Sequence, residues 1–584
     1  MLSEQEILKD IPLYISKSRI STMGNNTGSW RFVRPGYDEK TAPCSSTCPA
    51  GEDIARIEML AGKGGFFQAW ETIIIENPFP AVCGRVCFHT CEQACNRREL
   101  DFGLAIHNIE RLVGDTAIRE NYQVPPGLFK KGSINKHIAI AGAGPSGLSA
   151  AWFLSMLGYS CDIFETENEP GGVLRWGIPS YRLPRDILKY EINRITGLNF
   201  KDQNIKIFCN KTLTKDLIKK GLGYDAVFMG CGYGKSLKMG IPGEEKAVDG
   251  LEFLHDPEQS RDNTGKITAV IGGGNTAIDV ARSLIRTGAR PVIVYRRRKQ
   301  DMPAFAHEVE MAVEEGIEIR ELLAPLSIEE KNGKHILKLQ KMKTLDMDTK
   351  TGRARVVPDG DKIETLEADR IFTAIGAEPG KNWYLPPEKQ DNLIKLPRCT
   401  FQAEELPIIF GGDLASPVKS VTDAIASGKE AAIALDIYFS QGQDKINEQI
   451  NNCRVGNGSS VSMEIYLKGE RRKRSSHVVL FQEINTDYFP EIKKQEPGIL
   501  FPDQRAKSFE EVEQGYDREA GIKEALRCFN CGICNDCDNC RVFCPDAAVM
   551  VNETRYINLD YCKGCGICVV ECPRNAMSLE EEKI

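Results

Sequence analysis

Cysteine is the residue that most constrains this chain. The 584 residues include 21 cysteines, of which six lie between Cys44 and Cys95 and ten lie between Cys528 and Cys572. Disulfide frameworks are typical of small secreted domains, and the acidic, charge-interrupted N-terminus MLSEQEILKDIPLYI does not resemble a signal peptide. Both groups are therefore predicted to bind metal. The other five cysteines are expected to be core or surface thiols: Cys161, Cys209, Cys231, Cys399 and Cys453.

The C-terminal group contains one spacing twice. Each copy reads C-x2-C-x2-C-x3-C-P, beginning at Cys534 and at Cys562. This run binds [4Fe-4S] clusters in bacterial ferredoxins, where the fourth cysteine of each run binds the other cluster. A zinc ribbon does not need the same run twice. The sequence therefore predicts one cluster on Cys534, Cys537, Cys540 and Cys572, and a second on Cys544, Cys562, Cys565 and Cys568.

Two strand-turn-helix-strand patterns in the middle of the chain predict two Rossmann-like units in an α/β fold. In the first, the strand HIAIA precedes the turn Gly142-x-Gly144-Pro145-Ser146-Gly147, and Glu165 ends the next strand. Glycines at these positions let the backbone approach a pyrophosphate at a helix N-terminus, and the carboxylate can accept hydrogen bonds from ribose hydroxyls. We expect this unit to bind a dinucleotide.

The second copy differs at the end of its second strand. Its turn is Gly272-x-Gly274-Asn275-Thr276-Ala277, and the following strand ends in Arg296 and Arg297 instead of an acid. Guanidinium groups can pair with a 2′-phosphate, so this unit is predicted to prefer NADP(H) over NAD(H). The second strand ends in an acid in the first unit and in arginines in the second. This difference indicates that the first unit keeps FAD bound, while the second exchanges a nicotinamide nucleotide.

From Cys44 to about residue 440 the chain resembles the small (beta) subunit of bacterial glutamate synthase and its relatives, which include the N-terminal half of dihydropyrimidine dehydrogenase. The motifs are CSSTCPAGEDI (44–54), ENPFPAVCGRVC (76–87), CEQAC (91–95), GGVLRWGIPSYRLP (171–184), YRRRKQDMPA (295–304), TAIGAEP (373–379) and GGD (411–413). The resemblance implies that FAD lies on the first unit, with the NADPH unit inserted at about 248–365. It also implies flavin contacts from Gly172, Val173, Leu174, Ile178, Arg182, Gly376, Gly412, Asp413, Thr422, Asp423 and Ala424.

One cysteine pair departs from the family pattern. Relatives carry an RCxxC pair ahead of the CxxxCP element, whereas here the pair is Cys528 and Cys531, immediately before the ferredoxin run. The resemblance then implies one cluster on Cys44, Cys95, Cys528 and Cys531, and another on Cys48, Cys87 and Cys91. Relatives supply the last ligand with a Gln or Glu that falls on Glu110, which we favour over the alternative, Cys83. Either choice gives four [4Fe-4S] clusters and requires the two chain ends to be adjacent.

The predicted organisation has six parts. They are a helical iron-sulfur cap (1–115), a connector (116–136), an FAD-binding domain (137–247 and 366–440), an NADPH-binding domain (248–365), a second connector (441–523) and an α+β ferredoxin module (524–584). The second connector contains the basic run Arg471, Arg472, Lys473 and Arg474. Such a run could dock an acidic partner, but we expect a solvated face.

Charge and hydropathy exclude some functions. A net charge of −7 gives no reason to expect nucleic acid, and no apolar run approaches the length of about 18 residues that a membrane span needs, so we expect a cytoplasmic protein. The sequence predicts electron transfer between NADP(H) and ferredoxin-type clusters through FAD, with hydride reaching the flavin and no catalytic acid or base. Such a chain is a ferredoxin:NADP oxidoreductase, or the NADP-reactive subunit of a hetero-oligomeric complex such as a 2-oxoacid oxidoreductase, with ferredoxin or redox subunits as partners. The alternatives are a glutamate synthase small subunit and an electron-wiring scaffold with an idle nicotinamide site.

Overall fold

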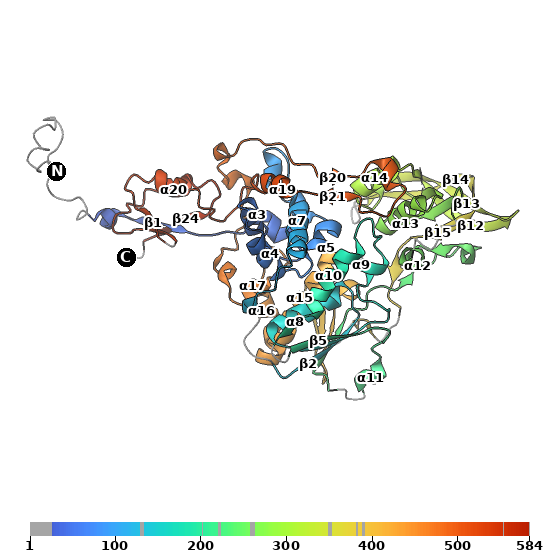
Figure 1. Cartoon of the computed structure of the whole chain (residues 1–584), viewed down its shortest axis with the longest axis horizontal. Coiled ribbons are helices and arrows are strands. Elements are labelled where there is room, and N and C mark those ends of the chain that lie inside the picture. Colours follow the sequence, from blue (N-terminus) through green and yellow to red (C-terminus); the bar gives the residue numbers. More distant parts are fainter. Residues whose placement is uncertain are drawn as a thin grey trace, which may run out of the picture.

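The computed structural model describes residues 26–128, 134–200, 203–219, 223–256, 263–348, 353–380, 384–387, 392–552 and 554–582. The molecule is elongated, with the ferredoxin module and the second nucleotide unit at opposite ends of the long axis (Figure 1). The cap lies between them, above the first nucleotide unit in this view. Among the described residues, no helix combines the length and the apolar character that crossing a bilayer requires.

The cap consists of short helices. Apolar residues at helical spacing build each buried face, as in the helix 66–74, where Phe66, Ala69, Trp70 and Ile73 are buried. The helices are α2 (Pro43–Thr47), α3 (Ile54–Gly62), α4 (Phe66–Ile74), α5 (Pro80–Val86), α6 (Thr90–Gln93) and α7 (Ile106–Arg119). The backbones of helices α5 and α7 are in close contact at Gly84. A Cβ on this glycine would lie 2.5 Å from the nitrogen of Arg111.

The first nucleotide unit is an eight-stranded sheet in the order β17-β18-β19-β6-β2-β3-β5-β4. Its central strands, from β19 to β5, are parallel. The strands are β2 (His137–Ala141), β3 (Ser160–Phe164), β4 (Asn199–Phe200), β5 (Gln203–Phe208), β6 (Ala226–Met229), β17 (Leu393–Lys395), β18 (Thr400–Gln402) and β19 (Ile408–Phe410). The helices are α8 (Pro145–Leu157), α9 (Val173–Trp176), α10 (Arg185–Thr196), α11 (Lys215–Lys219) and α15 (Val421–Gln441). Helices α8 and α15 cross closely at Gly428, where a Cβ would lie 2.5 Å from the carbonyl oxygen of Ser146.

The second nucleotide unit has a five-stranded parallel sheet in the order β11-β10-β9-β15-β8. Its helices cover one face, and an antiparallel three-stranded sheet, β12-β13-β14, packs its apolar side chains on the other. The strands are β8 (Val248–Asp249), β9 (Ile267–Ile271), β10 (Arg290–Tyr295), β11 (Glu318–Glu321), β12 (Leu323–Lys331), β13 (Lys334–Asp348), β14 (Arg353–Ala368) and β15 (Arg370–Thr373). The helices are α12 (Gly250–His255), α13 (Asn275–Arg286) and α14 (Ala306–Glu314). The ribbon of β7 (Lys235–Ser236) and β16 (Ala377–Glu378) stands where the chain passes between the two units.

The ferredoxin module includes a strand from the other end of the chain. Strand β1 (Val33–Tyr37) pairs antiparallel with β24 (Met577–Glu581) along its whole length. Arg31 reinforces this pairing by donating to Glu582 at 2.6 and 2.9 Å. Helix α19 (Arg518–Ala525) leads into the module, whose remaining elements are α20 (Asn539–Val542), β22 (Val549–Val551), β23 (Arg555–Ile557) and α21 (Ile567–Val570).

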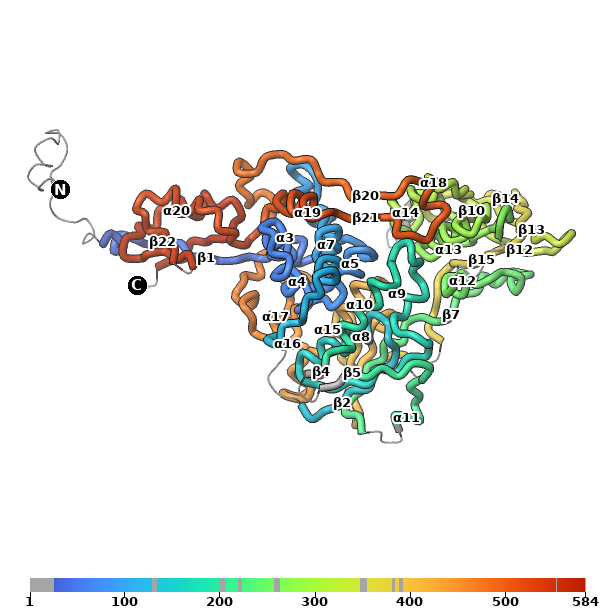
Figure 2. Tube along the Cα trace, in the orientation of Figure 1, coloured from blue at the N-terminus to red at the C-terminus, as the bar shows by residue number. Residues whose placement is uncertain are grey.

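The second connector is folded against the rest of the molecule. It contains α16 (Ile446–Asn452), α17 (Met463–Tyr466), β20 (Gly498–Ile499), α18 (Pro502–Arg505) and β21 (Glu513–Gly515). Figure 2 traces its orange tube past the cap toward the second unit and back to α19. The nitrogen of Val512 donates to the carbonyl oxygen of Tyr181 at 2.9 Å, and Glu511 accepts from Arg85 at 2.6 Å.

Several expected boundaries fall inside elements. The cap boundary at 115 lies within α7, which continues to Arg119. The second unit was expected to end at 365, but β15 lies in its sheet, so it extends to Thr373. The basic run is not a solvated face throughout, because Arg471 is only 4% exposed and Arg474 pairs with Asp53. Both arginines hold the connector on the cap.

Candidate functional site

The glycine turn of the first unit leaves open space at the N-terminus of α8. Gly142 has a φ of +96°, and a Cβ on Gly147 would lie 2.0 Å from the carbonyl oxygen of Gly142. Around Gly144, by contrast, an added Cβ would meet only the Cα of Gly172, at 3.8 Å. Helix α8 begins at Pro145, which has no N–H of its own. Tight packing behind the turn and free space in front of it fit a pyrophosphate at this helix end.

Residues distant in sequence border the same space. Gly172 has a φ of +52°, and a Cβ there would lie 2.8 Å from the Cα of Gly144. A Cβ on Gly412 would lie 3.1 Å from the Cβ of Ser146. Glu165, at the end of β3, accepts from the nitrogen of Ala143 at 2.7 Å and so braces the turn itself. After Gly172, Val173 is 50% exposed and Leu174 is buried, while burial raises the pKa of Asp413.

Three residues expected at the flavin have other contacts in the structure. The guanidinium of Arg182 pairs with Asp279 at 2.8 Å and with Glu308 at 2.9 Å, so it ties the first unit to α13 and α14 of the second. Gly376 accepts from the nitrogen of Leu237 at 2.9 Å, beside the β7-β16 ribbon.

Asp423 is the third. It accepts from Arg398 at 2.9 Å and from the hydroxyl of Ser420 at 2.6 Å. Ala424 follows it in the first turn of α15, where its nitrogen donates to the carbonyl oxygen of Ser420 at 3.0 Å. The carbonyl oxygen of Ile178 accepts from Arg185 at 2.9 Å.

The second unit has the same turn and a basic strand end. Gly272 has a φ of +149°, and around Gly274 an added Cβ would meet nothing within 4 Å. Asn275, at the start of α13, accepts from the nitrogen of Phe305 at 3.0 Å. Arg296 is exposed, and the buried Nε of Arg297 has no hydrogen-bond partner among the described residues. Open space at the turn and an orphaned guanidinium nitrogen fit a nucleotide that carries a 2′-phosphate.

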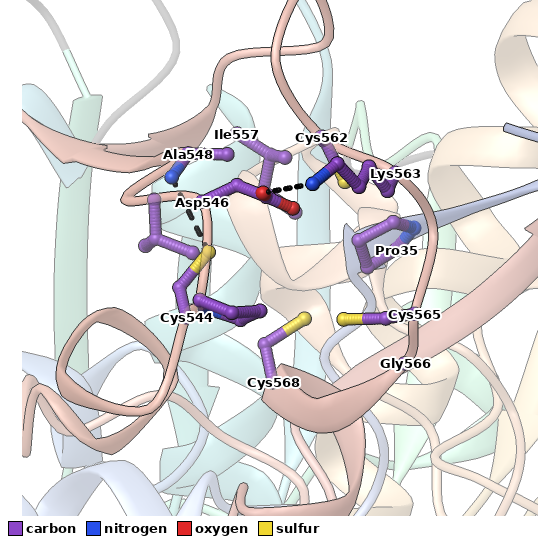
Figure 3. Close-up of a pocket in the computed structure, with 12 residues that line it drawn as sticks. Pro35, Cys544, Asp546, Ala548, Ile557, Cys562, Lys563, Cys565, Gly566 and Cys568 are labelled. Carbon is purple, nitrogen blue, oxygen red and sulfur yellow. Dashed lines mark hydrogen bonds and ion pairs between the residues drawn. The ribbon is translucent and has the colours of Figure 1, made fainter. Parts of the chain in front are cut away.

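Each predicted cysteine set of the ferredoxin module surrounds one cavity. One cavity is lined by Cys534, Cys537, Cys540 and Cys572, and the other by Cys544, Cys562, Cys565 and Cys568. Figure 3 shows Cys544, Cys565 and Cys568 with their sulfurs directed into the second cavity. Beside it Lys563 pairs with Asp546 at 2.7 Å, and the nitrogen of Ala548 donates to the sulfur of Cys544 at 3.2 Å (Figure 3). Four thiols around an apolar cavity form a donor set that fits a [4Fe-4S] cluster.

A third cavity joins the two ends of the chain. It is lined by Cys44 and Cys95 from the cap and by Cys528 and Cys531 from the segment after α19. Burial raises the pKa of Cys44, and the neighbouring Cys95, Cys528 and Cys531 raise it further. Buried thiolates this close together repel one another, and the iron of a cluster would supply the positive charge that offsets this repulsion.

The last cysteine group lies where α5 meets α7. Burial raises the pKa of Cys48, with further contributions from Glu52, Cys87 and Glu110, while Cys91 lies near Cys87 and Cys48. The glycine contact between α5 and α7 explains why Glu110 of α7 reaches the cysteines of α5.

Both candidates for the fourth ligand contact Asn77. The side-chain nitrogen of Asn77 donates to Glu110 at 3.0 Å and to Glu52 at 2.8 Å, and the thiol of Cys83 lies 3.8 Å from the oxygen of Asn77. Burial, together with the charge of Glu52, raises the pKa of Glu110 well above its ordinary value. A neutral Cys83 thiol is stable in a core, whereas two adjacent buried carboxylates need a proton or a cation. This contrast supports Glu110 as the proposed ligand.

A hydrogen bond connects the proposed flavin site to a proposed cluster ligand. Thr422, in the first turn of α15, donates its hydroxyl to the sulfur of Cys87 at 3.2 Å. Thr422 is 3% exposed. The end of the first nucleotide unit that is expected to face the flavin therefore contacts the cap cysteines directly.

Sequence reasoning missed two further side chains near the cysteine sulfurs. The hydroxyl of Tyr37, on β1, lies 3.4 Å from the sulfur of Cys540. Asn96 donates to the sulfur of Cys531 at 3.5 Å. Both contacts join residues more than 400 positions apart, so no local sequence pattern predicts them.

Comparison with known proteins agrees with this architecture. Residues 136–399 match the family described as pyridine nucleotide-disulphide oxidoreductase. Residues 37–122 match dihydropyrimidine dehydrogenase domain II, 4Fe-4S cluster, and residues 555–578 match the 4Fe-4S binding domain. The chain thus carries a nucleotide-binding region between two iron-sulfur regions.

Three relatives extend over most of the chain. The NADP(+)-dependent formate dehydrogenase subunit beta of Moorella thermoacetica is 33% identical over 528 residues, which cover 84% of this chain and 70% of that one. The NADPH-Fe(3+) oxidoreductase subunit beta of Geobacter sulfurreducens is 29% identical, covering 86% and 76%. The glutamate synthase [NADPH] small chain of Escherichia coli strain K12 is 32% identical over 427 residues, covering 67% and 87%. The chain therefore belongs to the glutamate synthase small subunit-like family of NADP-dependent flavin and iron-sulfur oxidoreductases.

Proposed function

We propose that this protein is the NADP-reactive subunit of a larger redox complex, in which electrons pass between NADP(H) and a ferredoxin-type partner through FAD and four [4Fe-4S] clusters. Bound FAD supplies the exchange between a nicotinamide, which gives or takes two electrons together, and clusters that take one at a time. Two of the relatives are beta subunits by name, which supports partner subunits for this chain as well.

The observation that carries the proposal is the hydrogen bond from Thr422 to Cys87 at 3.2 Å. It makes the flavin end of the first unit and the cap cysteines immediate neighbours. The cap in turn shares a cysteine-lined cavity with the segment that leads into the ferredoxin module. The long axis of the molecule then runs from the NADP(H) unit through the cap to the ferredoxin module (Figure 1).

The chain's own residues fix this arrangement. Arg182 holds the two nucleotide units together through Asp279 and Glu308. The second connector adds a further tie, because Arg505 pairs with Glu315 of the second unit at 3.4 Å and is itself 2% exposed. Removing one partner of an ion pair buried to this degree strongly destabilises a protein, because the other charge stays buried without a partner. We therefore expect the two nucleotide units to keep one relative orientation.

The test separates chemistry at the nucleotide units from electron exit through the ferredoxin module. A variant with Cys537→Ser and Cys565→Ser removes one ligand from each proposed module cluster. We expect it to lose NADP+ reduction by a dithionite-reduced 2[4Fe-4S] ferredoxin, while NADPH-driven reduction of ferricyanide continues. If both activities survive equally, electrons do not use the module and the proposed route is wrong.

A further inference from the structure

A polar cavity between the cap and the second connector has no role in the electron route. Its lining comes from the end of α16 and the loop after it, from Ile465 of α17, from Thr41 of the cap, and from the segment Arg471, Arg472, Arg474, Ser475 and Ser476. None of the residues expected to hold FAD, NADP(H) or a cluster lines it. A ligand bound there would therefore be separate from those cofactors.

Four arginines and no acidic residue line this cavity. Two of these four arginines have polar or acidic partners outside the lining of the cavity. Arg471 donates to the carbonyl oxygen of Gly51 at 2.5 Å and lies 3.4 Å from Glu76, while Arg474 pairs with Asp53 at 2.7 Å.

The other two, Arg454 and Arg472, have guanidinium groups that no ion pair to a described residue holds, although the charge of Arg472 lowers the pKa of the nearby Glu470. Both are exposed, and within the part of the chain that the structure describes neither side chain makes a hydrogen bond or an ion pair. The nearby Glu470 is paired with Lys473 at 2.6 Å. The cavity therefore presents two guanidinium groups that make no direct ion pair with the described residues.

Neutral hydrogen-bonding groups surround these guanidiniums. The amides of Asn451, Asn452 and Asn457 and the hydroxyls of Ser475 and Ser476 belong to the lining. Guanidinium forks with added amide and hydroxyl donors are the groups that recognise phosphate and carboxylate oxygens.

The wall of the cavity is held in place by the cap. The hydroxyl of Ser46 lies 3.4 Å from the carbonyl oxygen of Val455 and 3.2 Å from the side-chain oxygen of Asn457. Gly456 has a φ of +59°, and a Cβ on Gly458 would lie 2.3 Å from the carbonyl oxygen of Ser46. This loop is locked against α2, so the site needs little rearrangement before a ligand binds.

We propose that the cavity binds a compact oxyanion with two or more negative charges, held by Arg454 and Arg472. Two sources share this chemistry, namely a phosphorylated or pyrophosphate-bearing small molecule and a polycarboxylate. The site lies between the second connector and the cap, beside α2, which contains Cys44 and ends just before Cys48, and not on either nucleotide unit.

The test is calorimetric titration of the full FAD-loaded chain with inorganic pyrophosphate and, separately, with citrate. The titration uses the Arg296→Ala and Arg297→Ala background, so that the proposed 2′-phosphate site does not contribute, and NADP+ is left out because its own phosphates fit the ligand chemistry of the cavity. We expect one-to-one binding of at least one probe, and the tighter probe identifies the source. Replacing Arg454→Ala and Arg472→Ala together should raise the Kd by about tenfold or more, because both charge-assisted contacts are lost.

Lys473→Ala is the matched control. Lys473 is exposed and basic and follows Arg472 directly, but it pairs with Glu470 and does not line the cavity. Its loss should leave the Kd unchanged. Failure of both probes to bind, or equal binding by the double variant, overturns the proposal.

A second measurement does not depend on the variants. Arginine modification by phenylglyoxal, followed by peptide mass spectrometry, should label Arg454 and Arg472 in the free protein, and the bound probe should protect both. If the probe leaves the labelling of both residues unchanged, the proposed site is wrong.

Discussion

Replacing Cys528→Ser and Cys531→Ser should remove one cluster and leave the others. These two residues line the cavity shared with Cys44 and Cys95, so the double variant leaves two of its four cysteines. Four clusters hold about sixteen irons, four in each, and the iron content should fall to about twelve per FAD. The two module clusters should persist, because their proposed ligands line separate cavities.

The assay is iron and flavin analysis of anaerobically purified protein, with Mössbauer spectra to count intact [4Fe-4S] clusters. The module should stay docked, because Arg527 pairs with Asp101 of the cap at 3.1 Å and with Glu524 at 2.6 Å, independently of the cysteines. Cys453→Ser is the control, since Cys453 is buried but belongs to no proposed ligand set. An unchanged iron content in the double variant would refute the shared cluster.

Three further predictions follow from particular contacts. Replacing Arg296 and Arg297 with alanine should raise the KM for NADPH by about tenfold or more but hardly change that for NADH, because only NADPH carries a 2′-phosphate; equal effects in steady-state kinetics would contradict the assignment. Thr422→Val should make the cap cluster bound by Cys87 harder to reduce, since a hydrogen bond to a ligand sulfur stabilises the added electron, and a redox titration followed by electron paramagnetic resonance that shows no shift would argue against that ligand. Arg31→Ala should speed loss of module iron in air because it loosens β1 from β24, whereas the exposed Arg34→Ala serves as control; equal rates of iron loss would show that the strand does not protect the clusters.

Much of the architecture could be predicted because local patterns carry it. The turns at Gly142 and Gly272 follow apolar strands and open helices, and the ferredoxin run has a spacing that few other sites share. The positions of Cys528 and Cys531 also follow from a family pattern once the missing N-terminal pair is noticed. For the two turns and the ferredoxin run, short-range sequence sets the geometry.

Long-range contacts could not be predicted in the same way. Strand β1 reads VRPGY, with a proline and a glycine that argue against a strand, and it forms only because β24 offers a free edge. Arg182 lies in a motif shared with flavoproteins, but its guanidinium is directed by Asp279 and Glu308 from another unit. The basic run after Gly469 reads as a solvated face until the buried Glu76 and Asp53 show what Arg471 and Arg474 contact.

Anaerobic reduction of the isolated full-length chain by one equivalent of NADPH tests the central claim most directly. Flavin absorbance and the electron paramagnetic resonance signals of the clusters are recorded from the same sample. We predict that the flavin absorbance first falls as NADPH reduces the flavin and then recovers as electrons pass onward, while signals of reduced [4Fe-4S] clusters appear. An oxidised flavin with no reduced cluster after NADPH is added, or a bleached flavin whose electrons never reach a cluster, would contradict this route.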